Sequence, residues 1–452
     1  MKDYSAILTA IENGKEKILA AERFIWKHPE TGYREWKTHR YLKGLFEELG
    51  YTLTEFGNIP GFYTDLDSGK PGPCLAVFGE LDALIVPTHP ECDPETGAVH
   101  ACGHNCQAAA LYGLAVGLKA PGALDGLSGK IRLIAVPAEE LIELEYRQQL
   151  KDQGIIRFFG GKQELMARGI LDGADLCMMI HMADGRGYKS APGSNGCIIK
   201  QFTFTGKAAH AGGSPDDGIN ALYAANAALN AANALRETFR DTDHVRFHPI
   251  LTAGGSAVNS IPDCVTIEAY VRAATLDAIL LYNEKINRAF AAAAASIGCG
   301  LVIQDLHGYA PYYRDPLFAK VALEAAKDLL GEDRVDNNRP FGTGCSDIGD
   351  VSSVMPAIHP NIGGYSGTEH GNDLYITDPY LATVVSAKIQ AETAVRLLEN
   401  DAEKAKAVIA QKHTAFASIS EYLEAVEKLS FTAQAVIYEE NGEIRLHYKN
   451  NA

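Results

Sequence analysis

The chain has 452 residues, of which 46% are hydrophobic and 22% charged, a composition typical of a globular protein and a length that favours two domains. Its formal net charge of −16 argues against nucleic acid and anionic membranes as partners. Nine irregularly spaced cysteines, a charged N-terminal segment and the lack of an apolar run of about 18 residues predict a cytoplasmic protein without a membrane span.

The N-terminal part of the chain combines helical segments with short buried strands. Residues 4–49 show helical periodicity. Beyond them, the runs CLAVFGELDAL from Cys74 and KIRLIAVPAEE from Lys130 end in acidic residues, and DLCMMIHMADG from Asp175 carries a histidine at its tip. Such short apolar runs are typical of parallel strands buried on both faces. Because ligands of open α/β sheets bind beyond the carboxyl ends of the strands, the three runs direct acids and a histidine to one place.

The stretch 196–306 has a different pattern. It predicts a strand, an Ala-rich helix, two strands, a second Ala-rich helix and a final strand, which is the βαββαβ order of a ferredoxin-like domain. The pattern of the first region resumes after about residue 307. The sequence therefore predicts a catalytic α/β domain formed by residues 1–195 and 307–452, with a small domain inserted at 196–306. The Ala-rich helix faces suit either a subunit interface or an ordinary helix-on-sheet core.

A C-terminal extension begins at about residue 401. It is helical at first and ends in AVIYEENGEIRLHY, where Asn441-Gly442 between two alternating runs predicts a hairpin with a type I′ turn. No catalytic residue type stands out in it, and we expect it to cover a sheet edge or to form a dimer contact.

Cys102 and His104 form the densest group of candidate metal ligands. With one glycine between them, a thiolate and an imidazole can both turn toward one cation, and both are preferred ligands of zinc and neighbouring metals. The alternative is a buried cysteine beside an unrelated histidine. Glu139 and Glu140 follow a predicted strand, where one carboxylate could bind metal while the other takes a proton from water. The alternative is a solvated turn.

Three further residues lie at comparable positions. His181 closes an apolar strand, although a lone histidine there is more often a core or surface residue. Asp82 ends the run GELDAL, where it could equally be a helix N-cap. His370 lies in the Gly-rich segment GGYSGTEHGND, which could bring a distant histidine to the same place. Their convergence on strand ends favours a joint metal site.

The order of motifs along most of the chain resembles a known family. The motifs are HPETGYREWKT, GELDAL, HACGHN, VPAEE, IHMADG, GKAAHAGGSPDDGINAL, GGSAVNSIPDCVTIEAYVRA, SDIGDVS and GTEH. As a set they resemble the dinuclear metal-dependent amidohydrolases and peptidases that include aminoacylase, carnosinase, indole-3-acetyl-amino-acid hydrolase and p-aminobenzoyl-glutamate hydrolase, and the last two branches most. The resemblance implies a zinc-peptidase-like catalytic domain with a mixed central sheet and an inserted lid or dimerisation domain.

The resemblance also implies a role for individual residues and a cofactor. Two divalent ions, zinc or manganese, would be held by five ligands: Cys102, His104, Glu140, His181 and His370. Glu139 matches the general base and Asp82 the aspartate that supports the metal site. His210, Asn259 and Arg272 match small-domain residues that hold the substrate carboxylate or the developing oxyanion. In many relatives the histidine reaches into the site of the partner protomer, so the resemblance implies a homodimer formed through the lid domain.

Three departures from the family pattern bear on the substrate. Glu80 stands where peptidases of the wider family have a histidine, consistent with ligand duty passing to Cys102. Asn105 in HACGHNCQ replaces the usual aspartate and is closer to the p-aminobenzoyl-glutamate hydrolase branch. A longer, charged segment at 141–165 replaces the usual Gly-rich turn. We expect this segment to line the pocket, with Arg147 and Lys162 more often exposed charges than substrate contacts.

These observations favour an amidohydrolase that cleaves the amide bond of a small N-acyl or N-aroyl amino acid, such as a p-aminobenzoyl-glutamate-like compound. A dipeptidase acting on β-alanyl or similar dipeptides is the alternative, followed by a deacetylase of an amino-acid intermediate. A homologue that binds metal without catalysis would lack a ligand or the base, and none is missing. A third hypothesis makes Cys102 a nucleophile with His104 as its base, which the tight glycine turn disfavours.

Overall fold

The computed structural model describes residues 5–449 of the chain, which fold as two compact units. The first comprises the described residues up to Gly193, together with Tyr313–Phe341 and Ser346–Ile419. The second comprises Ser194–Tyr312, Gly342–Cys345 and the described residues from Ser420. Within residues 5–449, no helix is both long and apolar enough to cross a membrane.

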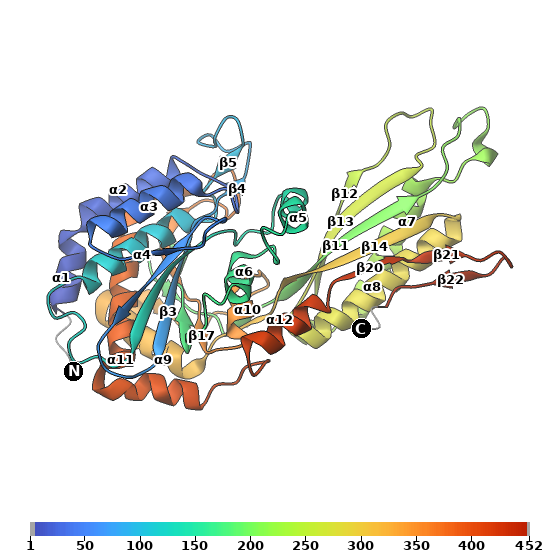
Figure 1. Ribbon diagram of the computed structural model, residues 1–452. Coiled ribbons are helices and arrows are strands. Elements are labelled where there is room, and N and C mark those ends of the chain that lie inside the picture. The colour runs from blue at the N-terminus through green and yellow to red at the C-terminus, as the bar shows by residue number, and fades with distance from the viewer. Residues whose placement is uncertain (1–4, 450–452) are drawn as a thin grey trace. The chain divides into compact units, whose positions relative to one another are not determined.

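A six-stranded mixed sheet forms the centre of the first unit (Figure 1). Its strands, in spatial order, are β1 (Thr54–Glu55), β2 (Phe62–Asp67), β6 (Lys130–Val136), β3 (Cys74–Glu80), β7 (Leu176–Met178) and β17 (Ala357–Ile358). The last four run parallel, whereas β1 and β2 are antiparallel to their neighbours. Every residue of β3 is buried, as expected for a parallel strand with both faces covered. The predicted mixed sheet is confirmed.

A second, smaller sheet and two short strands accompany the central sheet. The smaller sheet contains β8 (His181–Asp184), β9 (Tyr188–Lys189), β16 (Val335–Asp336), β18 (Asn361–Ser366) and β19 (Tyr375–Ile376). The two short strands, β4 (Leu84–Ile85) and β5 (Ala98–Val99), pair with one another. At the passages between the units lie β10 (Gly193–Ser194) and β15 (Tyr312–Tyr313).

Helix α4 (His104–Leu118) is the centre of the first unit's core. It packs on β3 and β6, and the helices α1, α2, α3 and α11 pack against it. Its glycines allow this close approach, because a Cβ at Gly117 would lie 2.7 Å from Cγ1 of Ile11. The helices of this unit are α1 (Ser5–Asn13), α2 (Lys15–Trp26), α3 (Trp36–Glu48), α4, α5 (Leu144–Asp152), α6 (Gly161–Ala167), α9 (Pro316–Leu330), α10 (Ile348–Ser352) and α11 (Ser386–Ala410). The last is preceded by a π-helix at Tyr380–Val385 and is interrupted at residues 399–402.

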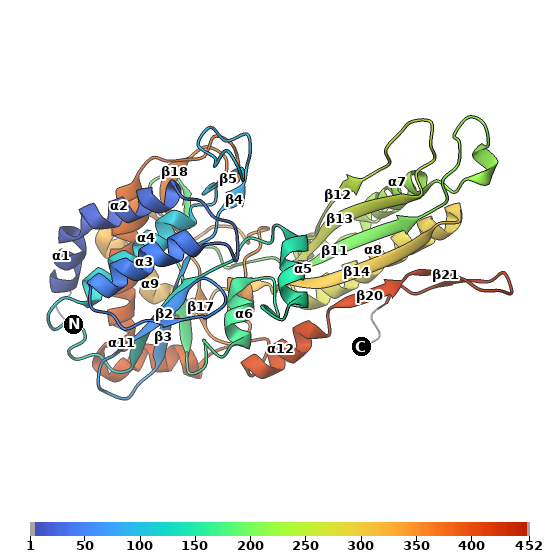
Figure 2. The same ribbon diagram turned by 45° about the horizontal axis from the view of Figure 1, so that its top comes forward.

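The second unit is a sheet covered by two helices. The antiparallel strands run, in spatial order, β12 (Arg246–Ala253), β13 (Cys264–Ala273), β11 (Gly196–Thr205), β14 (Gly300–Tyr309) and β20 (Phe431–Gln434). With α7 (Ala221–Ala234) and α8 (Leu276–Ile297), the first four strands give the predicted βαββαβ order, so the inserted ferredoxin-like domain is confirmed (Figure 2). The two helices contact each other and the sheet. Five alanines of α7 are buried in this core. The Ala-rich face of α7 thus packs on the sheet, which is one of the two roles expected from the sequence.

The C-terminal extension divides between the units: residues 401–419 lie in the first unit, and the described residues from Ser420 lie in the second rather than in the catalytic domain expected from the sequence. It contains α12 (Ile419–Glu427), β20, β21 (Val436–Tyr438) and β22 (Ile444–Leu446). Strand β20 pairs with β14 from Val302↔Gln434 to Asp305↔Phe431 and so covers that edge of the sheet. The predicted sheet-edge cover is therefore present.

The predicted hairpin is also present, but its turn differs from the expectation. Strands β21 and β22 pair from Tyr438↔Ile444 outward. Of the two residues at the tip, Gly442 has a positive φ of 86°, whereas Asn441 does not, and a type I′ turn needs both. Gly442 N donates to Glu439 O at 2.9 Å. The connection is thus a three-residue loop closed by a left-handed glycine, and the type I′ prediction is wrong.

Candidate metal centre

The candidate site of the first unit lies where three parallel strands end. β3 ends at Glu80 and leads to Asp82, β6 leads through Pro137 to Glu139 and Glu140, and β7 leads to His181 at the start of β8. Glu80 is paired in register with Val136 of β6, so the two acidic segments leave the sheet at the same level. The convergence expected from the strand pattern is present.

The structure brings all five predicted metal ligands and the predicted base together in three overlapping groups. In each group one donor atom per residue lies within 4.8 Å of the others. The groups are Cys102, His104 and His181; Cys102, Glu140 and His370; and His104, Glu139 and Glu140. Sγ of Cys102 is 3.3 Å from Nε2 of His181, and Nε2 of His370 is 3.6 Å from Oε1 of Glu140.

Two unusual backbone conformations put Cys102, His104 and His370 at the site. Gly103, between the first two, has φ 90°, and a Cβ there would lie 2.9 Å from Sδ of Met182, so only glycine fits this turn at the start of α4. His370 has φ 61°, which is uncommon for a residue with a side chain. Its backbone N–H donates to Ala101 O at 2.9 Å, which ties the loop of His370 to the loop of Cys102.

The segment from Ala138 to Glu140 is held from several sides. Ala138 has φ 59°; its N–H donates to Oε1 of Glu35 at 2.8 Å, and its carbonyl accepts from Gly161 N at 2.9 Å. The N–H of Glu140 donates to Oδ2 of Asp82 at 2.8 Å, and its carbonyl accepts from Arg147. A strained residue with this many contacts is typical of a site that must keep its geometry.

Asp82 lies against the ring of His104, at the position for which the resemblance implies a supporting aspartate. Nδ1 of His104 lies 2.9 Å from the backbone O of Asp82 and 3.1 Å from its Oδ1. Nδ1–H therefore donates to Asp82, which leaves the lone pair on Nε2. Nε2 is 3.1 Å from Oε2 of Glu80, yet among the described residues it has no hydrogen-bond partner, and neither has Oε1 of Glu140. Buried ligand atoms without partners fit a cation.

The electrostatics of the group also fit cations. Burial raises the pKa of the Cys102 thiol, and the charge of Glu140 raises it further. Burial likewise raises the pKa of Glu139, with Glu140, Glu80 and Asp347 adding to the effect. A thiol, imidazoles and carboxylates buried together lose this penalty when divalent ions share their charge. The donor set, with one cysteine, three histidines and carboxylates, suits two ions of the zinc or manganese type.

Sequence reasoning missed several buried polar residues around this group. Lys162 and Arg147, expected mostly as exposed charges, are 0% and 1% exposed, so that expectation is wrong. Asp347 lies in the motif SDIGDVS and contacts Lys162. The ring of His359 lies 5.7 Å from that of His181. The signal that could have found Asp347 is its acidic side chain inside a family motif.

The predicted substrate residues His210, Asn259 and Arg272 all belong to the second unit. His210 and Asn259 are exposed and lie on neighbouring segments, because Ala211 N donates to Asn259 O at 3.0 Å. Nδ1 of His210 accepts from Gly213 N at 2.9 Å. Arg272 lies on β13 and is partly buried, and within residues 5–449 its Nε has no hydrogen-bond partner.

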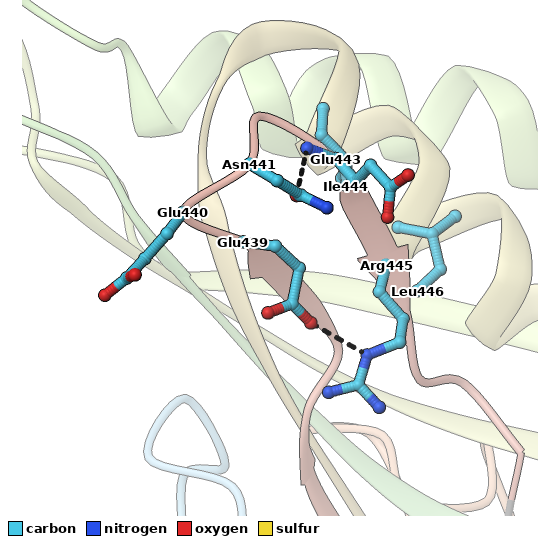
Figure 3. Close-up of a pocket in the computed structure, with 7 residues that line it drawn as sticks. All are labelled: Glu439, Glu440, Asn441, Glu443, Ile444, Arg445 and Leu446. Atoms are coloured by element: carbon cyan, nitrogen blue, oxygen red, sulfur yellow. Dashed lines mark hydrogen bonds and ion pairs between the residues drawn. The ribbon is translucent and has the colours of Figure 1, made fainter.

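A hollow on the β21–β22 hairpin is a separate feature of the second unit (Figure 3). It is lined by Glu439, Glu440, Asn441, Glu443, Ile444, Arg445 and Leu446. Glu439 and Arg445 form an ion pair at 3.2 Å across it. None of the predicted site residues lines this hollow, and we assign it no part in catalysis.

Comparison with known proteins links both units to one family of hydrolases. Residues 192–297 match the model of the M20 peptidase dimerisation domain. The chain is 28% identical to Xaa-Arg dipeptidase from Mus musculus over 86% of this chain and 87% of that protein. It is 30% identical to indole-3-acetyl-aspartic acid hydrolase from Enterobacter agglomerans over 55% of each chain.

A solved structure extends the similarity to the fold. It is that of a dinuclear metal binding peptidase of the M20 family from Bacillus subtilis, which superposes with a TM-score of 0.65 at 20% identity. The match covers 86% of this chain and 99% of the other. At this identity the likeness concerns the fold, including the mixed central sheet and the inserted domain.

Proposed function

The chain belongs to the M20 family of metal-dependent hydrolases that act on carbon–nitrogen bonds, and from this we propose that it cleaves the amide bond of a small N-acyl or N-aroyl amino acid. The observation that carries the proposal is the group of candidate ligands with Glu139 among them, all in the first unit and, apart from the exposed His370, largely buried. Asn105, in the position that resembles the p-aminobenzoyl-glutamate hydrolase branch, supports a substrate of that type.

We propose that Cys102, His104, Glu140, His181 and His370 hold two divalent ions. Dinuclear metal binding is typical of the family. The thiolate of Cys102 favours zinc, although manganese is compatible with the carboxylate and imidazole donors. When bound, the ions would act as Lewis acids that make water more acidic and polarise the substrate carbonyl.

Glu139 would be the general acid and base of the reaction. Its carboxylate lies beside the ligand atoms of His104 and Glu140, where it can take a proton from the attacking water. The same group can then return the proton to the leaving amine. Burial and the neighbouring carboxylates raise its pKa, and the charge of the bound ions would oppose this and favour the carboxylate form that accepts a proton.

The second unit would supply the residues that recognise the substrate. A guanidinium can bind a substrate carboxylate through two parallel hydrogen bonds, and Nε of Arg272 is buried without a partner among the described residues. Asn259 would assist this binding, and His210 would stabilise the oxyanion. The match to a dimerisation domain favours a homodimer. Cytoplasmic location remains a prediction.

A dipeptidase is the second candidate. It is favoured by the 28% identity to Xaa-Arg dipeptidase, which extends over 86% of this chain. The two candidates use the same chemistry on the same bond type and differ in what lies on the acyl side of the amide. The amine of a dipeptide would have to be accommodated there, whereas an aroyl group has no charge at that position.

Amine release from a substrate panel tests the proposal. The zinc- or manganese-loaded protein would be given N-aroyl amino acids, N-acyl amino acids and dipeptides, with Glu139→Gln as the blank. We expect release from N-aroyl or N-acyl amino acids that is absent in the variant. Release from dipeptides alone would replace the proposal by its second candidate. No release from any class by the metal-loaded protein would contradict both.

A further inference from the structure

Lys162 occupies a completely buried position beside the metal centre. It is 0% exposed and lies in α6, within the segment that replaces the family's Gly-rich turn. Its ammonium contacts Oε1 of Glu80 and Oδ1 of Asp347, and its backbone N–H donates to Oδ2 of Asp347 at 2.9 Å. A lysine is buried this deeply only when its charge is matched.

Through Glu80 this ammonium reaches a candidate metal ligand. One oxygen of Glu80, Oε1, is held by Lys162. The other, Oε2, accepts from Nε2 of Gln107 at 2.6 Å and lies 3.1 Å from Nε2 of His104. Because Lys162 holds the first oxygen, the second is fixed toward the ring nitrogen that Asp82 leaves free for a cation.

Charge balance gives Lys162 a second reason to be there. Glu80, Glu139 and Asp347 each place a carboxylate oxygen within 4.8 Å of the others. Three carboxylates this close disfavour one another's ionised forms unless a cation lies among them. The ammonium of Lys162 contacts Glu80 and Asp347. Its positive charge therefore offsets part of the negative charge that these two carboxylates place next to Glu139.

We propose that Lys162 is a positioning residue of the metal centre, which holds the carboxylate of Glu80 in place against Nε2 of His104. The inference rests on the proposed function, because it takes His104 to be a metal ligand. Residues that orient a ligand from behind typically change metal affinity about 10- to 100-fold when they are replaced.

The second unit offers a matched control. Lys200 is also 0% exposed; its ammonium contacts Asp305 and donates to Oδ1 of Asn283 at 2.6 Å. No predicted site residue belongs to this group. Lys200→Met removes a buried ammonium whose two partners are not candidate ligands. Lys162→Met removes a buried ammonium that contacts Glu80, next to the candidate ligand His104.

Cobalt(II) is the probe, because its visible absorption reports ligand geometry and its thiolate band reports Cys102. The whole chain would be loaded with cobalt(II), and absorption and the dissociation constant of each ion would be measured. We expect Lys162→Met to change the visible bands and to weaken the binding of one ion about 10- to 100-fold. We expect Lys200→Met to lower the melting temperature with unchanged bands. Wild-type bands and affinity in Lys162→Met would overturn the inference.

A double variant keeps the test decisive if Lys162→Met does not fold. Glu80→Gln/Lys162→Met removes both charges, which buried sites tolerate better than the loss of one partner. Because Lys162 acts through Glu80, the double variant should bind cobalt(II) as weakly as Glu80→Gln alone. If the double variant bound cobalt(II) more weakly than Glu80→Gln by the full factor that Lys162→Met causes alone, the two residues would act independently and the inference would be overturned. Failure of the wild-type chain to bind cobalt(II) would instead contradict the proposed function.

Discussion

Lys162 in the first unit and Lys200 in the second are equally buried, but their surroundings differ. Burial alone would lower the pKa of Lys162, yet Asp347, Glu80 and Glu139 together raise it above its usual value. Burial lowers the pKa of Lys200, because one carboxylate, that of Asp305, does not offset the loss of water. The first ammonium lies among an excess of acid, and the second has a single charged partner.

The difference separates a site from a core. In the pair Lys200–Asp305 one ammonium meets one carboxylate, which also accepts hydrogen bonds from the amides of Asn283 and Asn287, so its charge is matched without a further ion. Around Lys162 the buried acids outnumber the lysine even before Asp82 and Glu140 are considered. An excess of buried negative charge destabilises a fold unless other cations bind, so it indicates a site built for metal.

The largest expected effect is the loss of turnover in Glu139→Gln. Without a carboxylate to move the proton, we expect the turnover number to fall by about 10²- to 10⁴-fold. Metal content should stay at the wild-type level, because Glu139 is not among the predicted ligands. Steady-state amine release and metal analysis of the same sample measure both quantities. A variant that keeps turnover would show that Glu139 is not the base.

The second effect concerns the control region. Lys200→Met leaves Asp305 buried with its amide partners but without its cation, and we expect a loss of about 3–5 kcal/mol in the free energy of unfolding. Turnover per folded molecule should be unchanged. Chemical denaturation and active-site titration measure the two. A loss of turnover with unaltered stability would reverse the contrast between the two lysines.

Arg147 tests whether the 141–165 segment supports the site. Its guanidinium donates to the carbonyl of Glu140 and, at 2.6 Å, to that of Phe159. In Arg147→Met the segment that carries Glu139 loses this anchor, and since small displacements of reacting groups can lower a rate about 10²-fold, we expect a fall of up to that size in kcat with little change in KM. Substrate titrations separate the two constants. A rise in KM alone would indicate substrate contact instead.

The smallest effect is a pH dependence of stability from Glu22. Burial raises the pKa of this carboxyl to about 7, although Arg23 and the hydrogen bond from Asn105 lower it. The pKa of Glu22 is higher in the folded state than in the unfolded state. Its contribution to the free energy of unfolding is therefore fully present below the unfolded pKa and is lost as pH rises through about 7. We expect Glu22→Gln to lose less stability than wild type between about pH 5 and about pH 8. Melting temperatures at both pH values measure this, and parallel curves would contradict it.

Local sequence pattern is sufficient for the architecture and for the convergence of polar residues at the strand ends, whereas the complete set of candidate ligands depends on the resemblance of the motifs to a known family. The strand ends before Asp82, Glu139 and His181 could be recognised because each buried run stops within a few residues of its polar group. The role of Gly103 could also be recognised, because a glycine between Cys102 and His104 lets both side chains turn toward one cation. The inserted domain could be recognised because the order of its strands and helices is itself a local signal.

Long-range pairing explains what the sequence did not reveal. Lys162 looks like an exposed charge in a charged segment, and its partners Glu80 and Asp347 lie 82 and 185 residues away. Nothing local in Phe431–Gln434 identifies β14 as its neighbour, so the sequence alone does not assign the residues from Ser420 to the second unit. The type I′ turn expected at Asn441-Gly442 is not formed because the loop length depends on the register of the two strands, which these two residues do not determine.

Removal and return of metal is the most direct test of the central claim that the buried group of the first unit is a catalytic metal centre. Amine release would be measured on the wild-type chain before chelation, after complete removal of metal, and after addition of two equivalents of zinc or manganese. We predict that activity disappears with the metal and returns with it, in wild type but not in Glu139→Gln. Amine release that survives complete removal of metal would contradict the claim and would favour the thiol of Cys102 as a nucleophile.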